Sequence, residues 1–600
     1  MSGRVIVLGA DGMDAALTAR WLRDGTLPHL ARLATEGCWS PLQTTNPAES
    51  PVAWATFATG LNPGQHGIYD FLHRDPRTYL PRVAPLTVRL ATERPGLMAI
   101  NHRAGETIWS VASAAGRSCT LLRVPGTCPP EPVRGRMLSG LGVPDLLGTW
   151  GSSFLYTTER GRKSSQQTIH LADALEVESA IPGPRDTAIP LHLARQDDTL
   201  LLRCQGQTAT LAVGEWTPWW ALRFADSSGG VWPGMARFHL QALQPYLRLY
   251  LAPLNLDPRE PLLPLTYPDA YIQELVSRWG VFSTLGWPED ATGVNEGRLD
   301  EDAFLRQVHE TFDLQAAMVL DALTRGEGDL LIAVLEATDR VQHLFWRHQD
   351  PHDPLHTPEG AQRYGDAIRR IYQRFDALVG EVMATLAPTD TLLVLSDHGF
   401  KPVYRLVHLN AWLRDQGYLA ADAAASPGDT FWRGVDWRRT RAYAVGLSKI
   451  YLNLRGRERE GIVAPGRDYE ALCAEIAARL RAWRDPETGQ PFVQRVYRRD
   501  ELYRGSTVAD AGDLIIGFRA GYRTSSQTAV GRIPAETISP NRKAWSADHC
   551  SVDPSLVPGV LFCSRPLDLS SPSLLDLAPT ILDALGVPVP PEMEGHSLRA

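Results

Sequence analysis

Several short apolar runs in the sequence end abruptly in polar residues, and this pattern constrains the fold more than any other feature. One run spans Arg4–Asp11, and two more span Asp329–Glu336 and Thr391–Asp397. Continuous apolar runs are typical of strands that are buried on both faces, as in a parallel sheet covered by helices. Between the runs, apolar residues recur at helical spacing over Leu305–Leu323 and Tyr364–Leu386. The alternation of strands and helices predicts an α/β core.

Two stretches depart from this alternation. Residues 159–264 show the two-residue alternation of strands, with glycines at turn positions, and we expect a β-rich insert there. Residues 425–540 mix short strands with a helical segment, and we expect an α+β cap subdomain there. The predicted fold is a mostly parallel central sheet with helices on both faces, interrupted by these two units. The core would comprise residues 1–158, 265–424 and 541–600.

Charge and composition exclude several classes of protein. The chain has 60 Lys and Arg against 68 Asp and Glu, so its formal net charge of −8 gives no global positive field for nucleic acids or anionic membranes. The apolar run Val5–Ala10 is shorter than that of a signal peptide, and no run reaches the ~18 apolar residues of a membrane span. The 7 scattered cysteines, without a C-x-x-C pair, suggest neither a disulfide framework nor a thiolate zinc site. We expect a cytoplasmic protein with no membrane span and no nucleic-acid polymer as partner.

Acidic and imidazole residues lie where the predicted strands end. The carboxyl ends of parallel strands meet at one crevice, where ligands bind. A single Asp after a strand is more often a turn or helix-cap residue, so the joint placement carries the signal. Asp339 and His343 are four residues apart, which puts both on one face of a helix and lets them share a cation. The residues at strand ends are Asp11, Asp339, His343, Asp397 and His398, with Asp548 and His549 before the apolar run Gly559–Cys563.

This combination of side chains indicates a metal centre. Carboxylates and neutral imidazoles together suit Zn²⁺, with Mn²⁺, Fe²⁺ and Co²⁺ as alternatives that the sequence does not separate. Three Asp and three His would serve two ions with three protein ligands each, which leaves positions open for substrate and water. Open positions are typical of catalytic sites. We expect two divalent ions per chain, zinc in the first place and manganese as the main alternative.

A candidate nucleophile opens the segment Glu49–Phe71. Ser50 begins a predicted helix, and Pro51 occupies the first turn, where the missing N–H of proline has no cost. A helix N-terminus offers unpaired N–H groups and the positive end of the helix dipole, which favour an alkoxide and a phosphate. Taken alone, these residues would more often describe a simple N-cap at Ser50.

Five motifs are distributed over both ends of the chain: Leu8–Asp14, Ser50–Trp54 with Thr59–Ile68, Asp339–His343, Ser396–Phe400 and Trp545–His549. In sequence and order they resemble the alkaline phosphatase superfamily. Within it, the chain is similar to the type I phosphodiesterase/nucleotide pyrophosphatase-like hydrolases, including the microbial predicted phosphohydrolases/phosphomutases. The resemblance implies an alkaline-phosphatase-like core and a metal-dependent phosphoric ester hydrolase.

The resemblance also implies a role for each residue. It assigns one metal ion to Asp11, Asp397 and His398, with Ser50 as the bridging nucleophile, and the other ion to Asp339, His343 and His549. A small phosphate ester would then be hydrolysed in two in-line steps through a phosphoserine intermediate.

The sequence departs from the nucleotide pyrophosphatase pattern at two positions. Ser50 stands where Thr is common, and Ala53 aligns with an Asn that steadies a phosphoryl oxygen in that family. We expect a backbone N–H of the helix start to replace the Asn. Arg405, soon after the Asp397–His398 pair, is a weaker candidate for binding phosphate, because most surface arginines are simply solvated.

Other functions remain open at this point. A phosphomonoesterase or a phosphomutase would use the same centre. A phosphoethanolamine-type transferase normally has transmembrane helices, which this sequence lacks. A noncatalytic binding protein on this scaffold is disfavoured, because all six ligand positions and the hydroxyl are present. We expect a hydrolase of phosphodiesters or related phosphate esters.

Overall fold

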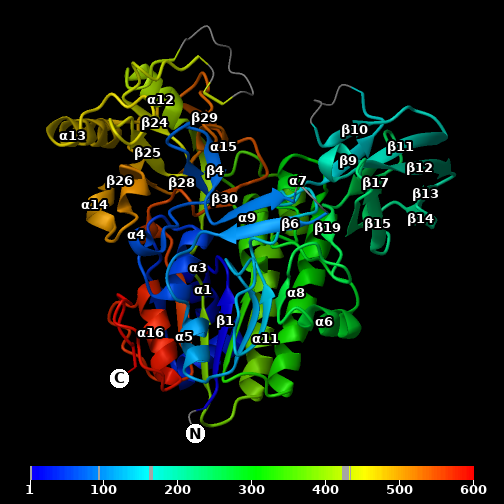
Figure 1. Ribbon diagram of the computed structural model, residues 1–600, viewed down its shortest axis with the longest axis horizontal. Coiled ribbons are helices and arrows are strands. Elements are labelled where there is room, and N and C mark those ends of the chain that lie inside the picture. The colour runs from blue at the N-terminus through cyan, green and yellow to red at the C-terminus, as the bar shows by residue number, and fades with distance from the viewer. Residues whose placement is uncertain (1–2, 92–94, 161–165, 422–430, 433, 600) are drawn as a thin grey trace.

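The structure, a computed structural model, describes residues 3–91, 95–160, 166–421, 431–432 and 434–599 (Figure 1). At its centre lies an 8-stranded sheet, in the order β2-β31-β22-β1-β21-β7-β8-β20. The strands are β1 (Val5–Ala10), β2 (Cys38–Leu42), β7 (Cys119–Val124), β8 (Gly135–Ser139), β20 (Thr266–Tyr267), β21 (Leu330–Leu335), β22 (Thr391–Leu395) and β31 (Gly559–Cys563).

The sheet is mixed, with a parallel centre. The neighbours β22, β1, β21, β7 and β8 pair in parallel, whereas β31 and β20 pair with them in antiparallel fashion, and β2 is antiparallel to β31. The prediction of a mostly parallel sheet therefore describes the centre and not the edges. The three apolar runs Arg4–Asp11, Asp329–Glu336 and Thr391–Asp397 form the adjacent strands β1, β21 and β22.

Helices cover both faces of this sheet, which explains why its strands are apolar throughout. Val5 and Val7 of β1 belong to one buried cluster, and Ile6 and Leu8 to the other. The first cluster includes α3 (Ser50–Thr59), α5 (Ile108–Ala114) and α16 (Leu574–Ala584). The second includes α1 (Ala15–Arg23), α2 (Pro28–Glu36), α8 (Glu301–Thr324), α9 (Ala337–Gln349) and α11 (Ala367–Ala384). The two predicted helical periodicities correspond to α8 and α11.

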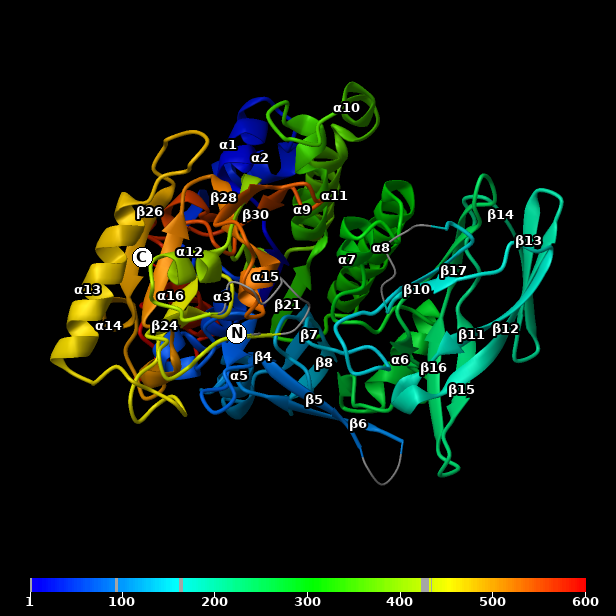
Figure 2. The ribbon, with the colours of Figure 1, turned by 90° about the horizontal axis from the view of Figure 1, so that it is seen from above.

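Three small sheets occupy most of the stretch predicted to be β-rich, and they lie to one side of the central sheet (Figure 2). Their pairing is mainly antiparallel. Whether residues 159–264 form a unit with those bounds stays a prediction. The strands are β9 (Phe154–Thr157), β10 (Thr168–His170), β11 (Glu176–Pro182), β12 (Ala188–Gln196), β13 (Thr199–Cys204), β14 (Gln207–Ala212), β15 (Trp220–Ala225), β16 (Val231–Ala236), β17 (Phe238–Ala242), β18 (Arg248–Leu251) and β19 (Asn255–Leu256).

The described part of the predicted cap, residues 431–432 and 434–540, is called the cap segment below and lies on the opposite side of the molecule from the β-rich sheets (Figures 1 and 2). It contains an antiparallel sheet of β24 (Ala442–Ala444), β25 (Lys449–Leu452), β27 (Leu514–Phe518) and β26 (Val493–Arg498), packed against α13 (Arg467–Ala482). The predicted boundary at residue 425 lies outside the described residues, so the extent of the cap subdomain stays a prediction. In the described part of the chain, every helix is too short or too polar to cross a membrane.

A glycine in β1 lets helix α3 approach the sheet. A Cβ at Gly9 would lie 2.6 Å from Cη2 of Trp54 in α3 and 3.0 Å from Cγ2 of Val334 in β21. The Trp54 indole is 1% exposed, so it has little room to move away. The close approach therefore depends on the absence of a side chain at residue 9.

We predict that Gly9→Ala lowers the free energy of unfolding by about 1–3 kcal/mol, because overpacking forces strain into a filled core. Urea denaturation measures the change. Gly96→Ala is the matched control, since among the described residues the nearest atom to its Cβ would be Cβ of Ala91 at 3.7 Å. A loss equal to that of the control would contradict the packing argument.

Candidate metal centre

Three adjacent parallel strands deliver the acidic residues to one edge of the sheet. Asp11 directly follows β1, and Asp397 follows β22. Asp339 lies in the first turn of α9, which begins two residues after β21. Because β22, β1 and β21 are neighbours, the three carboxylates meet at their carboxyl ends. All three side chains are buried.

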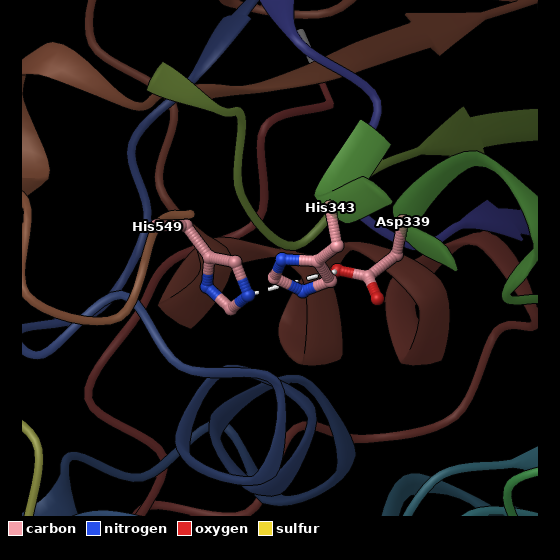
Figure 3. Close-up of side chains that lie close together, drawn as sticks. All are labelled: Asp339, His343 and His549. Carbon is pink, nitrogen blue, oxygen red and sulfur yellow. Dashed lines mark ion pairs between the residues drawn. The ribbon is translucent and has the colours of Figure 1, made fainter. Parts of the chain in front are cut away.

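One group of possible ligands consists of Asp339, His343 and His549 (Figure 3). Nε2 of His343 lies 3.3 Å from Oδ1 of Asp339, and Nε2 of His549 lies 3.6 Å from the same oxygen. Asp339 and His343 share a face of α9 as the four-residue spacing predicts. His549 follows β30 (Ala547–Asp548), so it comes from the far end of the sequence.

A second group consists of Asp11, Asp339 and His398, whose ligand atoms lie within 4.8 Å of one another. Oδ2 of Asp397 is 3.2 Å from Nε2 of His398, so this carboxylate adjoins the same group. Asp339 belongs to both groups and joins them. The structure thus brings together all six predicted ligands.

Each of the three imidazoles has its Nδ1 directed at a backbone carbonyl. An Nδ1–H that donates to a carbonyl fixes the tautomer and leaves the lone pair of Nε2 for a metal. The Nε2 atoms of all three point into the cluster, as their distances to the carboxylates show. The Nδ1 contacts are His343 to Ala547 (2.8 Å), His549 to Ala48 (2.6 Å) and His398 to Gly399 (3.2 Å).

The carboxylates follow a similar rule, with one oxygen held by a donor. The donors are Trp54 Nε1 to Asp11 Oδ2 (2.8 Å), Gly12 N–H to Asp397 Oδ1 (3.1 Å) and Arg340 Nη1 to Asp339 Oδ2 (2.8 Å). Among the described residues, the other oxygens of Asp339 and Asp397 are buried without a hydrogen-bond partner. An orphaned buried carboxylate oxygen is costly, so these atoms fit a site that takes a cation.

The pKa values indicate the same need for positive charge. Burial raises the pKa of Asp11 and of Asp397 well above the usual range, and repulsion from Asp339 adds to both shifts. For Asp339 burial acts in the same direction, but the electrostatic and hydrogen-bond interactions with His343 and Arg340 outweigh it, and its pKa is lowered. Burial lowers the pKa of His549 to about 4, which keeps that imidazole neutral. Carboxylates and neutral imidazoles of this kind suit divalent metals such as Zn²⁺.

Ser50 lies beside this cluster. Its Oγ is 3.1 Å from Nε2 of His398 and 3.4 Å from Oδ1 of Asp11. Ser50 is the first residue of α3, and the N-cap position belongs to Glu49. The hydroxyl is therefore directed at the cluster and does not cap the helix.

The first turn of α3 narrows the choice of donors for a phosphoryl oxygen. The N–H groups of Val52 and Ala53 both donate to the Glu49 carbonyl at 2.9 Å, and Pro51 has no N–H. In the part of the chain that the structure describes, the N–H of Ser50 is the amide of this turn without a backbone acceptor. The N–H of Ser50 is therefore the candidate in this turn to take over the role of the Asn that Ala53 replaces.

Two further residues singled out from the sequence are engaged elsewhere. Arg405, on β23 (Lys401–Val407), pairs with Asp485 at 3.1 Å and with Glu487, so its guanidinium is already bound by two carboxylates. Asp548 accepts hydrogen bonds from the N–H groups of His549 and Cys550 and pairs with Arg523 at 2.9 Å. Neither side chain is carried into the proposed site.

Sequence reasoning missed the groups that orient the ligands. Trp54 and Gly12 lie inside the quoted motifs, and Arg340 follows Asp339 directly. Their position next to ligands was the available signal. Nothing in the spacing shows which carboxylate oxygen each donor holds.

A family model for type I phosphodiesterase / nucleotide pyrophosphatase matches residues 5–200 and 249–536. The chain belongs to this family. It is therefore a phosphoester hydrolase, and the family resemblance drawn from the motifs is confirmed. Comparison with curated proteins found no match.

Solved structures with similar folds cover nearly the whole chain. Phosphonoacetate hydrolase from Sinorhizobium meliloti 1021 in complex with phosphonoformate is 14% identical with a TM-score of 0.43, and covers 98% of this chain and 96% of its own. The same enzyme in complex with phosphonoacetate is 13% identical with a TM-score of 0.45, and the match covers 98% of this chain and 96% of that chain. Human ectonucleotide pyrophosphatase / phosphodiesterase 5 is 11% identical with a TM-score of 0.41, and the match covers 99% of this chain and 97% of that chain.

We predict that purified protein binds two divalent ions per chain and that His343→Ala and Asp397→Ala each lower this number. Each substitution removes one ligand from a different group of side chains. Elemental analysis after dialysis measures the stoichiometry, with His102→Ala, an exposed imidazole outside the cluster, as the control. A metal-free preparation with full activity would contradict the prediction.

Proposed function

We propose that this chain is a dinuclear-metal-dependent phosphodiesterase that acts through a phosphoserine intermediate on Ser50. The observation that carries the proposal is the position of the Ser50 hydroxyl, 3.1 Å from His398 and 3.4 Å from Asp11. It lies beside oxygens of Asp339 and Asp397 that, among the described residues, are buried without a hydrogen-bond partner. Two roles follow for the cluster, which are to hold cations and to activate the hydroxyl.

The residues divide into two sets of ligands. Asp339, His343 and His549 would hold one ion, and Asp11, Asp397 and His398 would hold the other together with Ser50. Divalent ions bound there would supply positive charge to the nucleophile, the phosphoryl oxygens and the leaving group. Zn²⁺ fits the donor set best, with Mn²⁺ as the alternative.

The protein residues perform the rest of the chemistry. Ser50 Oγ gives its proton to solvent water and attacks phosphorus, so that an Oγ–P bond forms and the bond to the leaving group breaks. The leaving alkoxide takes up a proton from water and departs as the alcohol. Water then attacks the same phosphorus in line, the Oγ–P bond breaks, and the hydroxyl is restored. The N-terminal end of α3 and the N–H of Ser50, which has no backbone acceptor among the described residues, stabilise negative charge that develops on the phosphoryl oxygen.

An aromatic cluster beside the site supports a diester as the substrate. Phe71, Trp150 and Trp287 are partly exposed, with ring centroids 6.1–6.3 Å apart. Trp150 also lines a cavity with Pro51 and Ala55 of α3. A diester carries a second substituent that must be placed somewhere, and these rings offer apolar surface next to the nucleophile helix.

The aromatic cluster contacts residues next to the nucleophile and next to the proposed metal ligands. The Phe71 N–H donates to Oε2 of Glu49 at 3.0 Å, and Glu49 precedes Ser50. The guanidinium of Arg340, which holds Asp339, lies 3.7 Å from the Trp287 ring centroid. The segment Ser50–Asn62 contains no Lys or Arg, so the nucleophile helix itself offers no cationic side chain to the additional charge of a monoester.

We predict that Ser50→Ala lowers turnover on the order of a thousandfold or more while fold and metal content persist, because binding cannot replace a covalent step. Steady-state kinetics with bis-p-nitrophenyl phosphate measure the loss. Thr56→Ala is the matched control, a hydroxyl of the same helix that is 3.0 Å from Nε2 of His66. Turnover near normal in Ser50→Ala would assign the nucleophile elsewhere.

We also predict that kcat/KM is higher for bis-p-nitrophenyl phosphate or p-nitrophenyl thymidine monophosphate than for p-nitrophenyl phosphate. The reason is that the aromatic cluster offers apolar surface to the second substituent of a diester, whereas the nucleophile helix offers no Lys or Arg to the additional charge of a monoester. The three substrates are compared with the same metal-reconstituted protein. If the monoester is preferred by about tenfold or more, a phosphomonoesterase or phosphomutase would replace the diesterase.

A further inference from the structure

A buried lysine of the cap segment contacts the loop that follows the nucleophile helix. Lys449 begins β25 and is 1% exposed. Its Nζ lies 2.9 Å from Oδ2 of Asp70, which is 0% exposed. The same nitrogen donates to the carbonyl oxygens of Tyr69 at 3.1 Å and Leu72 at 3.4 Å. Three acceptors from one turn thus match the three N–H groups of the ammonium.

The cap segment leaves space for this pair by placing glycines around it. A Cβ at Gly446 would lie 2.4 Å from Oδ2 of Asp70, and a Cβ at Gly512 would lie 2.8 Å from Cβ of Lys449. The N–H of Leu447 donates to Oδ2 of Asp70 at 2.8 Å. Gly446, Leu447 and Lys449 of the cap segment therefore surround the carboxylate of Asp70, and Gly512 leaves room for the Lys449 side chain.

From Asp70 the contacts continue to the nucleophile. Oδ1 of Asp70 accepts from the N–H of Leu72 at 2.9 Å, which fixes the turn. Between them, the N–H of Phe71 donates to Oε2 of Glu49 at 3.0 Å. Glu49 is 0% exposed, holds the N-cap position of α3 and directly precedes Ser50. A continuous set of polar contacts therefore joins the cap segment to the first turn of α3.

We propose that Lys449 is a positioning residue for Ser50. Its ammonium holds the turn Tyr69–Leu72, and this turn holds Glu49, which sets the position of the Ser50 hydroxyl at the cluster. The inference rests on the proposed role of Ser50 as the nucleophile. Among the described residues, the ammonium of Lys449 contacts Asp70, Tyr69 and Leu72 and none of the Asp and His residues of the proposed metal centre. We therefore expect its removal to act on the position of Ser50 while the metal content stays close to that of the wild type.

The energetics of buried ion pairs favour this role over a purely stabilising one. Replacing a buried pair with apolar groups is often neutral for stability, so the pair is weak evidence for stabilisation. Reaction rates are far more sensitive to position, because a misplacement of about 1 Å can cost about 100-fold in rate. A buried charge that fixes one turn is suited to that requirement.

A cavity next to the pair makes the inference testable with a small molecule. The cavity has a volume of about 410 Å³ and is lined by Tyr69, Asp70 and Leu72, the residues that accept from Lys449, together with Thr507 and Asp510 of the cap segment. We expect an alkylammonium ion to pass from this cavity into the space that Lys449→Ala vacates and to pair there with the carboxylate of Asp70.

The test uses full-length, metal-loaded enzyme with bis-p-nitrophenyl phosphate as substrate. Lys449→Ala and Lys449→Met should each lower kcat by about tenfold to 100-fold, with KM and metal content close to those of the wild type. Ethylammonium should restore a large part of the kcat of Lys449→Ala in a saturable manner. Tetramethylammonium should not, because it has the charge but no N–H donor. Lys543→Ala, at an exposed lysine, should show neither the loss nor the response.

A second variant avoids an unpaired buried charge. In Lys449→Met with Asp70→Asn both charges are removed, and we expect the same loss of kcat as for Lys449→Met alone, because the two residues act in one path. If Lys449→Met alone does not fold, the kcat of the double variant tests the positioning role in its place.

The outcomes distinguish a failure of the positioning role of Lys449 from a failure of the proposed function. A kcat within about twofold of the wild type in Lys449→Met, or ethylammonium raising the activity of all variants equally, would overturn the positioning role and leave the proposed function intact. Absence of turnover in the wild-type enzyme would overturn the proposed function and this inference with it.

Discussion

Three carboxylates share one buried edge of the central sheet, and the cost of placing these charges together governs the architecture around them. Asp11, Asp339 and Asp397 are each at most 2% exposed. Buried charges are unfavourable unless cations or donors compensate them. The surroundings supply one fixed donor for each carboxylate, and the remaining oxygens face the imidazoles of the same cluster. The proposed ions would complete that compensation, so binding them and folding the site are coupled.

The fold meets this constraint with a few rigid elements. Adjacent parallel strands bring the carboxylates together, and α9 presents Asp339 and His343 on one face. Helix α3 approaches β1 over Gly9, which allows the Trp54 indole to hold Asp11 and places Ser50 at the cluster. The cap segment adds Lys449 behind the same helix start. One helix therefore connects the core sheet, the nucleophile and the cap segment.

Local sequence was enough to predict the elements whose identity depends on local periodicity. The strands β1, β21 and β22 and the helices α8 and α11 have apolar patterns that match their environment. The direction of β31 was not predictable, because an apolar run is the same in a parallel and an antiparallel strand. The six ligands were recognised from motifs, and the structure brings them together, while their roles as ligands stay a proposal.

Long-range pairings were outside the reach of the sequence. Arg405 resembles a phosphate-binding residue until its partners Asp485 and Glu487 are known, and these lie in a different part of the chain. The carbonyls that orient His343 and His549 belong to Ala547 and Ala48, which carry no side-chain signal. The same holds for Lys449, whose spacing to Asp70 follows no helix or strand period. Tertiary packing alone determines these contacts.

The central claim is that the phosphoryl group of the substrate is transferred first to Ser50 and then to water. The stereochemistry of hydrolysis tests it most directly, with a diester made chiral at phosphorus by sulfur substitution and hydrolysed in ¹⁸O-labelled water. Each in-line displacement inverts phosphorus, so two successive steps give net retention of configuration. Retention is the predicted result. Net inversion would show a single displacement by water and would contradict the covalent role of Ser50.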